Sequence, residues 1–433
     1  EYVSLKVSAV TGPHQPWGYE QVVQRAVDAL MPLYREAARY DPPKFINLDM
    51  EEYKDLHMTI DVFTRILSQP GMHHLPAGIV LQTYLPDALP AMQQLQEWAR
   101  GRVDAGGAPI KVRVVKGANL SMETVESEMH GWPLTTQASK QDTDTNYITV
   151  LDWALTPERT RNIRIGVAGM NLFTVAYAFE LAHDRGVLES GGVEFEMLSG
   201  MASPQSKAVA EDTGHLLFYV PVVDPAHYDV AIAYLVRRLE ENSLPQNFMS
   251  SIFDLGTEDV IAKEQKRFRA AYQRMGKLAT GPRRTQNRLK ESEADLAAPV
   301  KTAEGEWTFN NTPDSDPALP ANQEWARRIT SRIAQSKLGA EAALKSRVSD
   351  PARLDDLVKA TAAAGDAWAK RPASERAKIL HAAGIEIGKR RGDLMEIAAH
   401  ECGKTLDQGD VEVSEAIDFC HYYAEQALAL ETH

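Results

Sequence analysis

Cysteine is scarce in this sequence. Only Cys402 and Cys420 occur among 433 residues, and their spacing fits no metal-binding motif. So few cysteines are typical of a reducing compartment, and we expect a cytoplasmic protein. Long apolar runs are also missing, because the longest, LLFYVPVV at 216–223, is far shorter than the roughly 20 residues of a membrane-spanning helix. The opening EYVSLKVSAV has neither a basic start nor an initiator methionine, so no signal peptide is expected.

Several catalytic and nucleotide-binding motifs are absent as well. There is no GxGxxG, so a dinucleotide, if bound, is not held in the Rossmann manner. The absence of HExxH, GxSxG and clustered Cys and His argues against zinc and serine hydrolases and predicts no metal site. A net charge of −13 argues against general nucleic-acid binding. The rest of the composition, 44% hydrophobic and 25% charged, is that of a globular protein with two or three domains.

Up to about residue 255, short β-rich runs alternate with helical patterns. Such alternation indicates an α/β fold with a parallel sheet and right-handed crossovers. Several runs are apolar on both faces, as a covered parallel sheet requires. Seven repeats fall one short of a (β/α)8 barrel, and the chain opens in what reads as the middle of a strand, so we predict a barrel that lacks its first strand. The expected strands are 2–9, 45–50, 78–85, 110–117, 163–169, 193–198 and 216–223.

The character of the sequence changes after this region. Residues 263–290 carry ten Lys or Arg against one acid, a net of +9, which we interpret as a solvated basic helix. A site for an acidic neighbouring surface is the alternative. Residues 292–322 are rich in Ala, Pro, Asn, Asp and Glu without periodicity, which predicts an extended connector. Helical patterns follow at 326–345, 351–369, 373–391 and 411–429.

Four polar residues lie within strands that are otherwise strongly apolar: Lys6, Asp49, Gln82 and Arg113. A charge in such a strand must face a polar site or be paired, because an unpaired buried charge costs several kcal/mol. In a parallel barrel, function sits at the carboxyl ends of the strands. We therefore expect these side chains at the mouth of the barrel. A purely structural ion pair between Lys6 and Asp49 is the alternative.

Two further stretches carry candidate ligand-binding cations. VRVVKGAN at 112–119 supplies an arginine, a lysine and a Gly-Ala pair where the backbone can approach a phosphate or an electron-rich ring, although this signal is weak alone. YLVRRLEEN at 234–242 reads as the helix that follows the last strand. It is either an ordinary surface helix, in which Arg238 pairs with Glu241 three residues further on, or one whose two arginines clamp a carboxylate together with Lys6. In the second case Glu241 orients one guanidinium.

Taken together, these stretches resemble the proline dehydrogenase domain of the bifunctional proline utilisation flavoenzymes, which oxidise proline to glutamate. The matching stretches run in the family's order over nearly all of residues 1–255: VSLKVSA, INLDMEEY, VLQTYLPD, VRVVKGAN, HGWP, FEMLSGMA, YVPVV and YLVRRLEEN. Residues 256–345 would be a linker with connecting helices. Residues 346–433, with SERAKILHAAGIEIGKRRGDL, are similar to the first helices of an aldehyde dehydrogenase.

The resemblance implies an FAD-dependent oxidation of L-proline to Δ1-pyrroline-5-carboxylate, with hydride transfer to flavin N5. The second step, NAD-dependent oxidation of glutamate semialdehyde, would belong to the truncated C-terminal module. NAD would serve only the missing part of that module. The family passes its electrons to a membrane quinone, which implies peripheral contact with the inner membrane. A homo-oligomer is compatible with the sequence, and no DNA-binding domain is recognisable.

The resemblance also assigns roles to individual residues. Lys6, Arg237 and Arg238 would hold the proline carboxylate, with Asp49 and Glu241 positioning these cations. Tyr219 and Leu198 would pack on the pyrrolidine ring. The flavin would contact a separate set along its length: Arg113, Gln82, Lys116, Gly117, Ala118 and, at the pyrophosphate or adenosine end, Lys140.

Two residues depart from the family's usual pattern. Asn119 follows KGA where an aromatic residue is usual, so substrate packing or flavin access is expected to differ. Met170 stands before Asn171 where His is frequent, which affects one of the FAD contacts. Two other functions remain open: a barrel aldolase with Lys6 or Lys116 as a Schiff-base amine, and an inactive fragment. Borohydride trapping of a carbonyl substrate without flavin would identify the aldolase. Absence of both cofactor and turnover would identify the inactive fragment.

A barrel without its first strand has two unpaired edges, which is unfavourable. We therefore predict that this chain is only marginally stable or needs the missing residues. Thermal unfolding followed by circular dichroism with added FAD tests this. One sharp cooperative transition with flavin bound would contradict it.

Overall fold

The computed structural model describes residues 2–12, 14–296 and 309–431. Within them the chain forms two compact units. The barrel unit holds residues up to Val125 together with Leu134–Arg283, and the helical unit holds Glu126–Pro133 and the residues from Arg284 onward.

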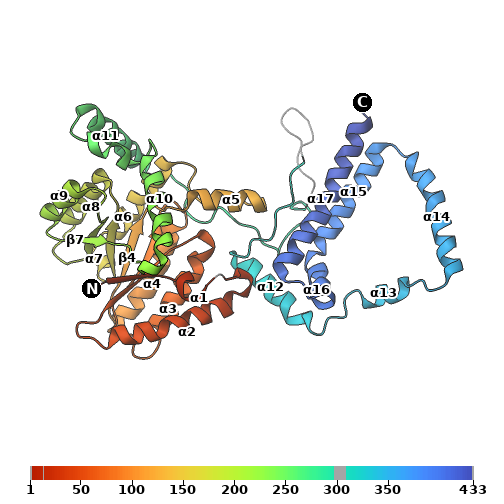
Figure 1. Ribbon diagram of the computed structural model, residues 1–433, viewed down its shortest axis with the longest axis horizontal. Coiled ribbons are helices and arrows are strands. Elements are labelled where there is room, and N and C mark those ends of the chain that lie inside the picture. Colours follow the sequence, from red (N-terminus) through yellow and green to blue (C-terminus); the bar gives the residue numbers. More distant parts are fainter. Residues whose placement is uncertain (1, 13, 297–308, 432–433) are drawn as a thin grey trace. The chain divides into compact units, whose positions relative to one another are not determined.

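The barrel unit is built on one open, curled sheet of seven parallel strands in sequence order (Figure 1). All seven strands expected from the sequence are present, which confirms the predicted fold class. Six of them are shorter than expected, β1 and β7 by the most residues. β1 ends at Lys6 because Ser8 begins the short helix α1, and β7 ends at Tyr219, two residues before Pro221, which has no N–H for a ladder. The strands are β1 Tyr2–Lys6, β2 Phe45–Asp49, β3 Ala77–Gln82, β4 Ile110–Val115, β5 Ile163–Ala168, β6 Val193–Leu198 and β7 Leu216–Tyr219.

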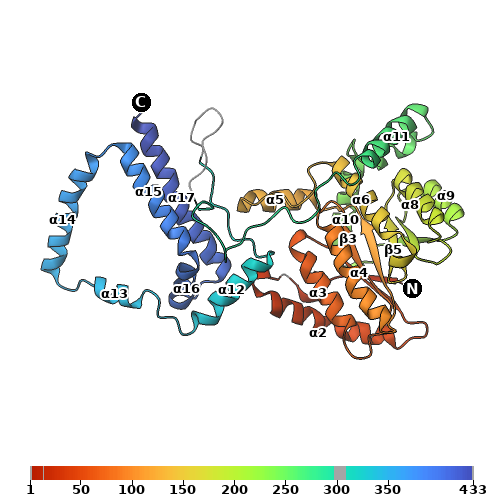
Figure 2. The ribbon, with the colours of Figure 1, turned by 180° about the vertical axis from the view of Figure 1, so that it is seen from behind.

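Helices cover the outer face of the sheet. β3 is buried on both faces and β2 and β4 nearly so, as expected for parallel strands between a helical layer and a filled interior. The long helix α2 buries an apolar stripe that includes Val23, Ala26, Leu30 and Tyr34. α2, α3 and α4 lie together over the first half of the sheet (Figure 2). The barrel helices are α1 Ser8–Thr11, α2 Tyr19–Ala38, α3 Leu56–Leu67, α4 Ala88–Asp104, α6 Lys140–Ala154, α7 Pro157–Thr160, α8 Leu172–Asp184, α9 Ser203–Thr213, α10 Tyr228–Ser243 and α11 Glu258–Gln273. α5 Leu120–His130 begins in the barrel unit and ends in the helical unit.

The basic segment expected at 263–290 begins within α11. Its Phe268 packs against Phe173 and Tyr177 of α8, while Lys266 and Arg269 are exposed. The interpretation as a solvated basic helix therefore holds only for the first part of the segment. α11 ends at Gln273, and both Arg284 and the side chain of Arg288 are buried. None of the helices in the described ranges is long and apolar enough to span a membrane.

The described residues of the helical unit contain two more helices than the sequence pattern predicted. The pattern expected at 326–345 is two helices, because residues 334–339 interrupt it. α16 was missed because it follows α15 after a single residue, Arg390, and has no clear apolar stripe. α15 and α17 pack along each other. The helices are α12 Pro320–Ile333, α13 Ala340–Ser346, α14 Pro351–Ala369, α15 Ala373–Lys389, α16 Arg391–Cys402 and α17 Leu406–Glu431.

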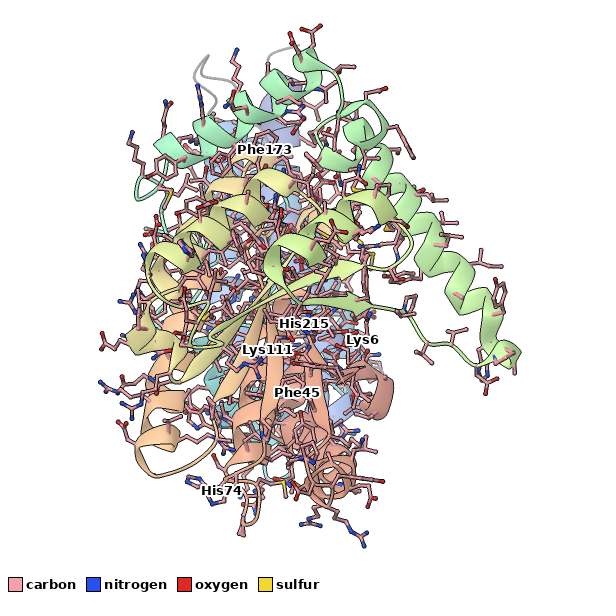
Figure 3. The ribbon with its side chains drawn as sticks, turned by 90° about the vertical axis from the view of Figure 1, so that its left-hand side faces the viewer. Lys6, Phe45, His74, Lys111, Phe173 and His215 are labelled. Atoms are coloured by element: carbon pink, nitrogen blue, oxygen red, sulfur yellow. The ribbon has the colours of Figure 1, made fainter. Side chains whose placement is uncertain are left out.

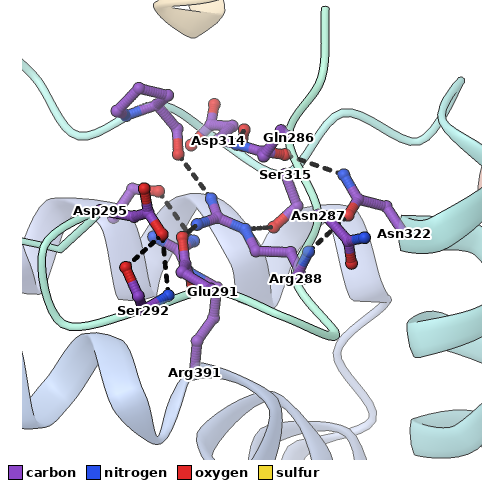
Figure 4. Close-up of polar contacts among 12 residues, drawn as sticks. Gln286, Asn287, Arg288, Glu291, Ser292, Asp295, Asp314, Ser315, Asn322 and Arg391 are labelled. Atoms are coloured by element: carbon purple, nitrogen blue, oxygen red, sulfur yellow. Dashed lines mark hydrogen bonds and ion pairs between the residues drawn. The ribbon is translucent and has the colours of Figure 1, made fainter.

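The expected connector is held by polar side chains rather than by regular structure (Figure 4). Arg288 donates to Ser315 Oγ at 2.8 Å and to the Pro313 carbonyl at 2.8 Å. Ser315 Oγ in turn donates to Asp410 Oδ1 at 2.7 Å, and Asp410 also binds the buried Arg391. These bonds fix two connector segments to α16 and α17. The part of the connector at 297–308 lies outside the described residues.

One glycine permits the interior of the barrel to pack. A Cβ on Gly166 of β5 would clash with Glu196 and would lie 2.8 Å from Lys111 Cε. Gly166→Ala should therefore lower stability by about 1–3 kcal/mol through overpacking. Gly101→Ala, in α4 with no neighbour within 4 Å, is the matched control and should raise stability by about 0.4–1 kcal/mol. Thermal melts of both variants measure this, and equal shifts would contradict the packing argument.

Candidate active site

Five charged side chains meet inside the curl of the sheet, and we call them the inner charge network: Asp49, Lys111, Arg113, Glu194 and Glu196. Lys111 is 1% exposed and forms ion pairs with Glu194 and, at 2.5 Å, with Glu196. Its ammonium lies 5.9 Å from the centre of the Phe45 ring, and the two side chains are neighbours in Figure 3. Buried charges of this kind persist only when they are paired.

Arg113 connects this network to the mouth of the barrel. Its Nε donates to Glu196 Oε2 at 2.5 Å, and its Nη1 donates to Asp49 Oδ1 at 3.0 Å. Its guanidinium carbon lies 5.3 Å from the centre of the Tyr219 ring. The guanidinium is therefore fixed between two carboxylates and one aromatic face.

Burial and neighbouring carboxylates shift the pKa values of groups around the network. Burial, followed by the charge of Asp49, raises the pKa of Tyr219 to about 12. Burial alone would raise the pKa of Glu194, but Lys111 and the hydroxyl of Tyr2 outweigh it, so that this pKa lies below its usual value. At neutral pH, Tyr219 is therefore a neutral hydrogen-bond donor, and its hydroxyl lies 3.3 Å from Asp49 Oδ2.

The loop after β4 brings backbone close to the mouth. Gly117 has φ +115°, and a Cβ there would lie 2.5 Å from the Tyr84 ring, so only glycine fits this position. Gln82 and Asn119 both donate to the carbonyl of Glu51, at 3.2 and 2.9 Å. The Oε1 atom of Gln82 is buried, with no hydrogen-bond partner in the described part of the chain.

A second group of charges lies beside this loop. Asp144 forms ion pairs with Lys116 at 2.6 Å and with Lys140 at 2.5 Å. The two lysines outweigh the burial of Asp144, so its pKa lies below its usual value. Burial, together with the charge of Lys116, lowers the pKa of Lys140 to about 8. Two cations held this close are suited to a ligand with more than one negative charge.

The arginine pair of α10 divides between two environments. Arg238 is half-buried, forms an ion pair with Glu241 at 2.7 Å and lies 5.5 Å from the centre of the Tyr234 ring, whereas Arg237 is exposed. This ion pair is the one expected of an ordinary surface helix, and it equally allows Glu241 to orient this guanidinium toward a ligand. Burial raises the pKa of Glu241 against the charges of Arg238 and Lys140, so this helix and the lysine pair act on the same carboxyl. The apolar side chains of α10 are about half exposed: Ile232, Leu235, Val236 and Leu239.

Lys6 does not form the buried ion pair with Asp49 that the structural alternative predicts. Its side chain is 53% exposed, and its ammonium lies 3.8 Å from Glu51 Oε1. Asp49 is paired with Arg113 instead. A buried structural pair of Lys6 and Asp49 is therefore wrong, because Lys6 is the last residue of an edge strand and its side chain is exposed beside Glu51.

The remaining predicted residues have mixed surroundings. Leu198 is half-buried and lies beside Tyr219 in the β6–β7 register, whereas Ala118 is exposed. Asn171 caps α8 by accepting hydrogen bonds from two backbone N–H groups. Met170 packs against an apolar cluster that includes Phe248 and Met249. In this chain Met170 therefore packs among apolar side chains, whereas the His that is frequent at this position in the family is polar.

The sequence prediction missed Lys111, Glu194 and Glu196. A signal was present, because IKVRVV and VEFEML each place two charges two residues apart, on the same face of a strand. Two basic residues on one strand and two acidic residues on another predict facing charges inside the sheet. Among the described residues, no group of three or more His, Cys, Asp or Glu is placed to hold a metal ion.

The fold and these sites define an α/β barrel-type protein with a cation-lined mouth over buried carboxylates. Residues 1–251 match the proline dehydrogenase family, and residues 335–433 match the aldehyde dehydrogenase family. Because the first match covers more than half of the chain, the chain belongs to the proline dehydrogenase family. It carries part of an aldehyde dehydrogenase domain after it, and both assignments confirm the sequence resemblance.

Similar proteins support the same assignment. The bifunctional protein PutA of Escherichia coli K12 is 27% identical over 462 residues, which cover 100% of this chain and 33% of that protein. Proline utilization A from Corynebacterium freiburgense is 40% identical with a TM-score of 0.81, over 100% of this chain and 39% of that one. The Bdellovibrio bacteriovorus protein, inactivated by N-propargylglycine, is 26% identical with a TM-score of 0.80, over 99% and 44%. The chain spans about a third of the length of the curated relatives it matches.

The lysine pair makes a pH-dependent prediction. Lys140 should react with an amine-specific reagent with a midpoint near pH 8, because its neutral form becomes populated as pH rises through its lowered pKa. Lys116→Met removes a repelling cation and should move the midpoint up. Asp144→Asn removes the stabilising anion and should move it down. Competitive labelling read by mass spectrometry measures all three midpoints, and shifts in the same direction for both variants would contradict this electrostatic account.

Proposed function

We propose that the barrel unit oxidises L-proline to Δ1-pyrroline-5-carboxylate with FAD as cofactor. The observation that carries this proposal is a set of paired cations at the mouth of the barrel. Arg113 pairs with Asp49, Lys116 and Lys140 pair with Asp144, and Arg238 pairs with Glu241, whose carboxyl also feels the charge of Lys140. Such a mouth suits a diphosphate-bearing ring cofactor together with a small carboxylate substrate. Membership in the proline dehydrogenase family supports the same chemistry.

The residues present fit an FAD molecule. Gln82 Oε1 is a buried acceptor without a partner in the described residues, as expected of an atom that meets a ring N–H. The left-handed Gly117 and the following Ala118 leave the backbone accessible at the end of β4. Lys116 and Lys140 would hold the phosphates. Met170 and Asn171, the cap of α8, lie in one loop. This loop would lie near the same cofactor.

The substrate would be held by its carboxylate and its ring. Lys6, Arg237 and Arg238 would bind the carboxylate, with Glu241 orienting Arg238. The Nε atom of Arg238 is buried with no hydrogen-bond partner among the described residues, so it has a donor to offer. Leu198 and Tyr219, neighbours on β6 and β7, would pack on the pyrrolidine ring, and Asn119 would border it.

The contribution of the chain to the reaction is mainly orientation. Fixing the carboxylate and the ring together presents one face of the substrate C5 to the cofactor, which lowers the entropic part of the barrier. Asp49 fixes Arg113 at the mouth, and Tyr219 stays protonated because its pKa is about 12. When bound, the flavin supplies the hydride acceptor.

The whole protein's further activity follows from its second domain. We propose that the whole protein completes the oxidation to glutamate with NAD in its aldehyde dehydrogenase module, whose family residues 335–433 match. A membrane quinone as electron acceptor and peripheral membrane contact are supported by the family resemblance alone, and a homo-oligomer is compatible with the sequence.

A visible absorption spectrum tests the proposed function. The purified protein with added FAD should show a bound flavin band that bleaches on anaerobic addition of proline. Flavin binding without bleaching would indicate a defect in the substrate clamp, by which we mean Lys6, Arg237 and Arg238. A protein that binds no flavin in this assay would overturn the proposal for this chain.

The clamp itself is tested by Arg238→Ala. One lost charge-assisted bond of about 1.5–3 kcal/mol should weaken proline binding about 10- to 150-fold, with the flavin spectrum unchanged. Arg161→Ala is the control, because Arg161 forms an exposed ion pair with Asp104 away from the mouth. Bleaching titrated against proline measures both variants. Equal losses in the two would refute the clamp.

A further inference from the structure

Glu196 is a buried carboxylate between two cations. It is 2% exposed, its Oε2 accepts from Arg113 Nε at 2.5 Å, and its Oε1 lies 2.5 Å from Lys111 Nζ. It lies below the mouth and touches none of the proposed substrate-binding residues other than through Arg113. Any influence of Glu196 on the mouth must therefore act through Arg113.

The contact between Arg113 and Glu196 crosses an entire strand, β5. Arg113 of β4 pairs in register with Gly166 of β5, and Glu196 belongs to β6 on the far side. A side chain on Gly166 would clash with Glu196 and would close this path. The glycine lets two side chains from non-adjacent strands meet, so the position of Arg113 is set by three strands together.

Glu196 and Asp49 bind different nitrogens of the Arg113 guanidinium. Glu196 takes Nε, Asp49 takes Nη1, and among the described residues this leaves Nη2 for a ligand. Asp49 is also shared with Ser4 at 2.7 Å and Tyr219 at 3.3 Å, and it lies nearer the open mouth. Glu196 is thus the more deeply buried of the two supports. Two charge-assisted bonds at different nitrogens fix the plane of a guanidinium, which one bond does not.

We propose that Glu196 is a positioning residue for the oxidation reaction, holding the plane of Arg113 so that Nη2 faces the bound cofactor. This role rests on the proposed function, because it assumes that Arg113 meets the flavin. The ion pair of Glu196 with Lys111 keeps the carboxylate in place from below.

A matched pair of variants separates positioning from simple destabilisation. Glu196→Gln removes the charge that holds Arg113. Glu194→Gln is the control, since Glu194 lies two residues earlier on the same face of β6 and pairs with Lys111 but does not bond Arg113. Both variants disturb Lys111, so a merely structural role would affect both alike.

The first readout needs no flavin. Arg113 should react with phenylglyoxal at least threefold faster in Glu196→Gln than in the unsubstituted protein, and at an unchanged rate in Glu194→Gln, with exposed Arg100 as the internal reference. Mass spectrometry of peptides measures this. An unchanged rate in Glu196→Gln, or an equal rise in both variants, would overturn the proposal. If Glu196→Gln failed to fold, Glu196→Asp, one methylene shorter with its charge retained, should raise the labelling rate in the same direction.

The second readout follows the reaction. At saturating proline, the limiting rate of anaerobic flavin bleaching should fall at least tenfold in Glu196→Gln with proline affinity unchanged, and less than twofold in Glu194→Gln. Equal losses in both variants would refute positioning. If the unsubstituted protein failed to bleach, the proposed function would fall and the role of Glu196 in that reaction with it, whereas the labelling comparison would still report whether Glu196 fixes Arg113.

Discussion

The ion pair between Arg113 and Glu196 is the interaction on which the interior of the barrel unit depends. It joins β4 to β6 across the bare backbone of Gly166, and Lys111 closes it from below. Each of these groups is almost fully buried, so each requires the others to remain charged. A filled apolar interior would stabilise a sheet equally well. The charged one additionally presents an oriented guanidinium at the carboxyl ends of the strands.

The mouth extends this arrangement outwards through shared partners. Asp49 connects Arg113 to Tyr219 and Ser4, and Asp144 holds Lys116 and Lys140 together beside the loop that contains Gly117. Glu241 feels the charges of both Arg238 and Lys140. Carboxylates thus lie beneath or between the cations and limit their repulsion. This arrangement leaves a positive surface for anionic ligands without a buried unpaired charge.

Sequence reasoning succeeded where one local signal sufficed. All seven strands were found because each is a short apolar run between helical patterns, and Glu241 was matched to Arg238 because residues three apart are neighbours on a helix. It failed for α16, which has no apolar stripe. It also failed for the partner of Asp49, because Lys6 and Arg113 are both basic residues on nearby strands and composition cannot separate them.

The sequence by itself determined the order of the strands, the family resemblance and the residue types available at the strand ends. Tertiary structure alone decided which of these residues meet. Glu196 reaches Arg113 only because the sheet curls and Gly166 has no side chain, a relation between residues 83 positions apart. Local pattern fixes the face on which a side chain lies, since strands alternate with period two. The distance across that face depends on strand order, register and curvature, which no single stretch contains.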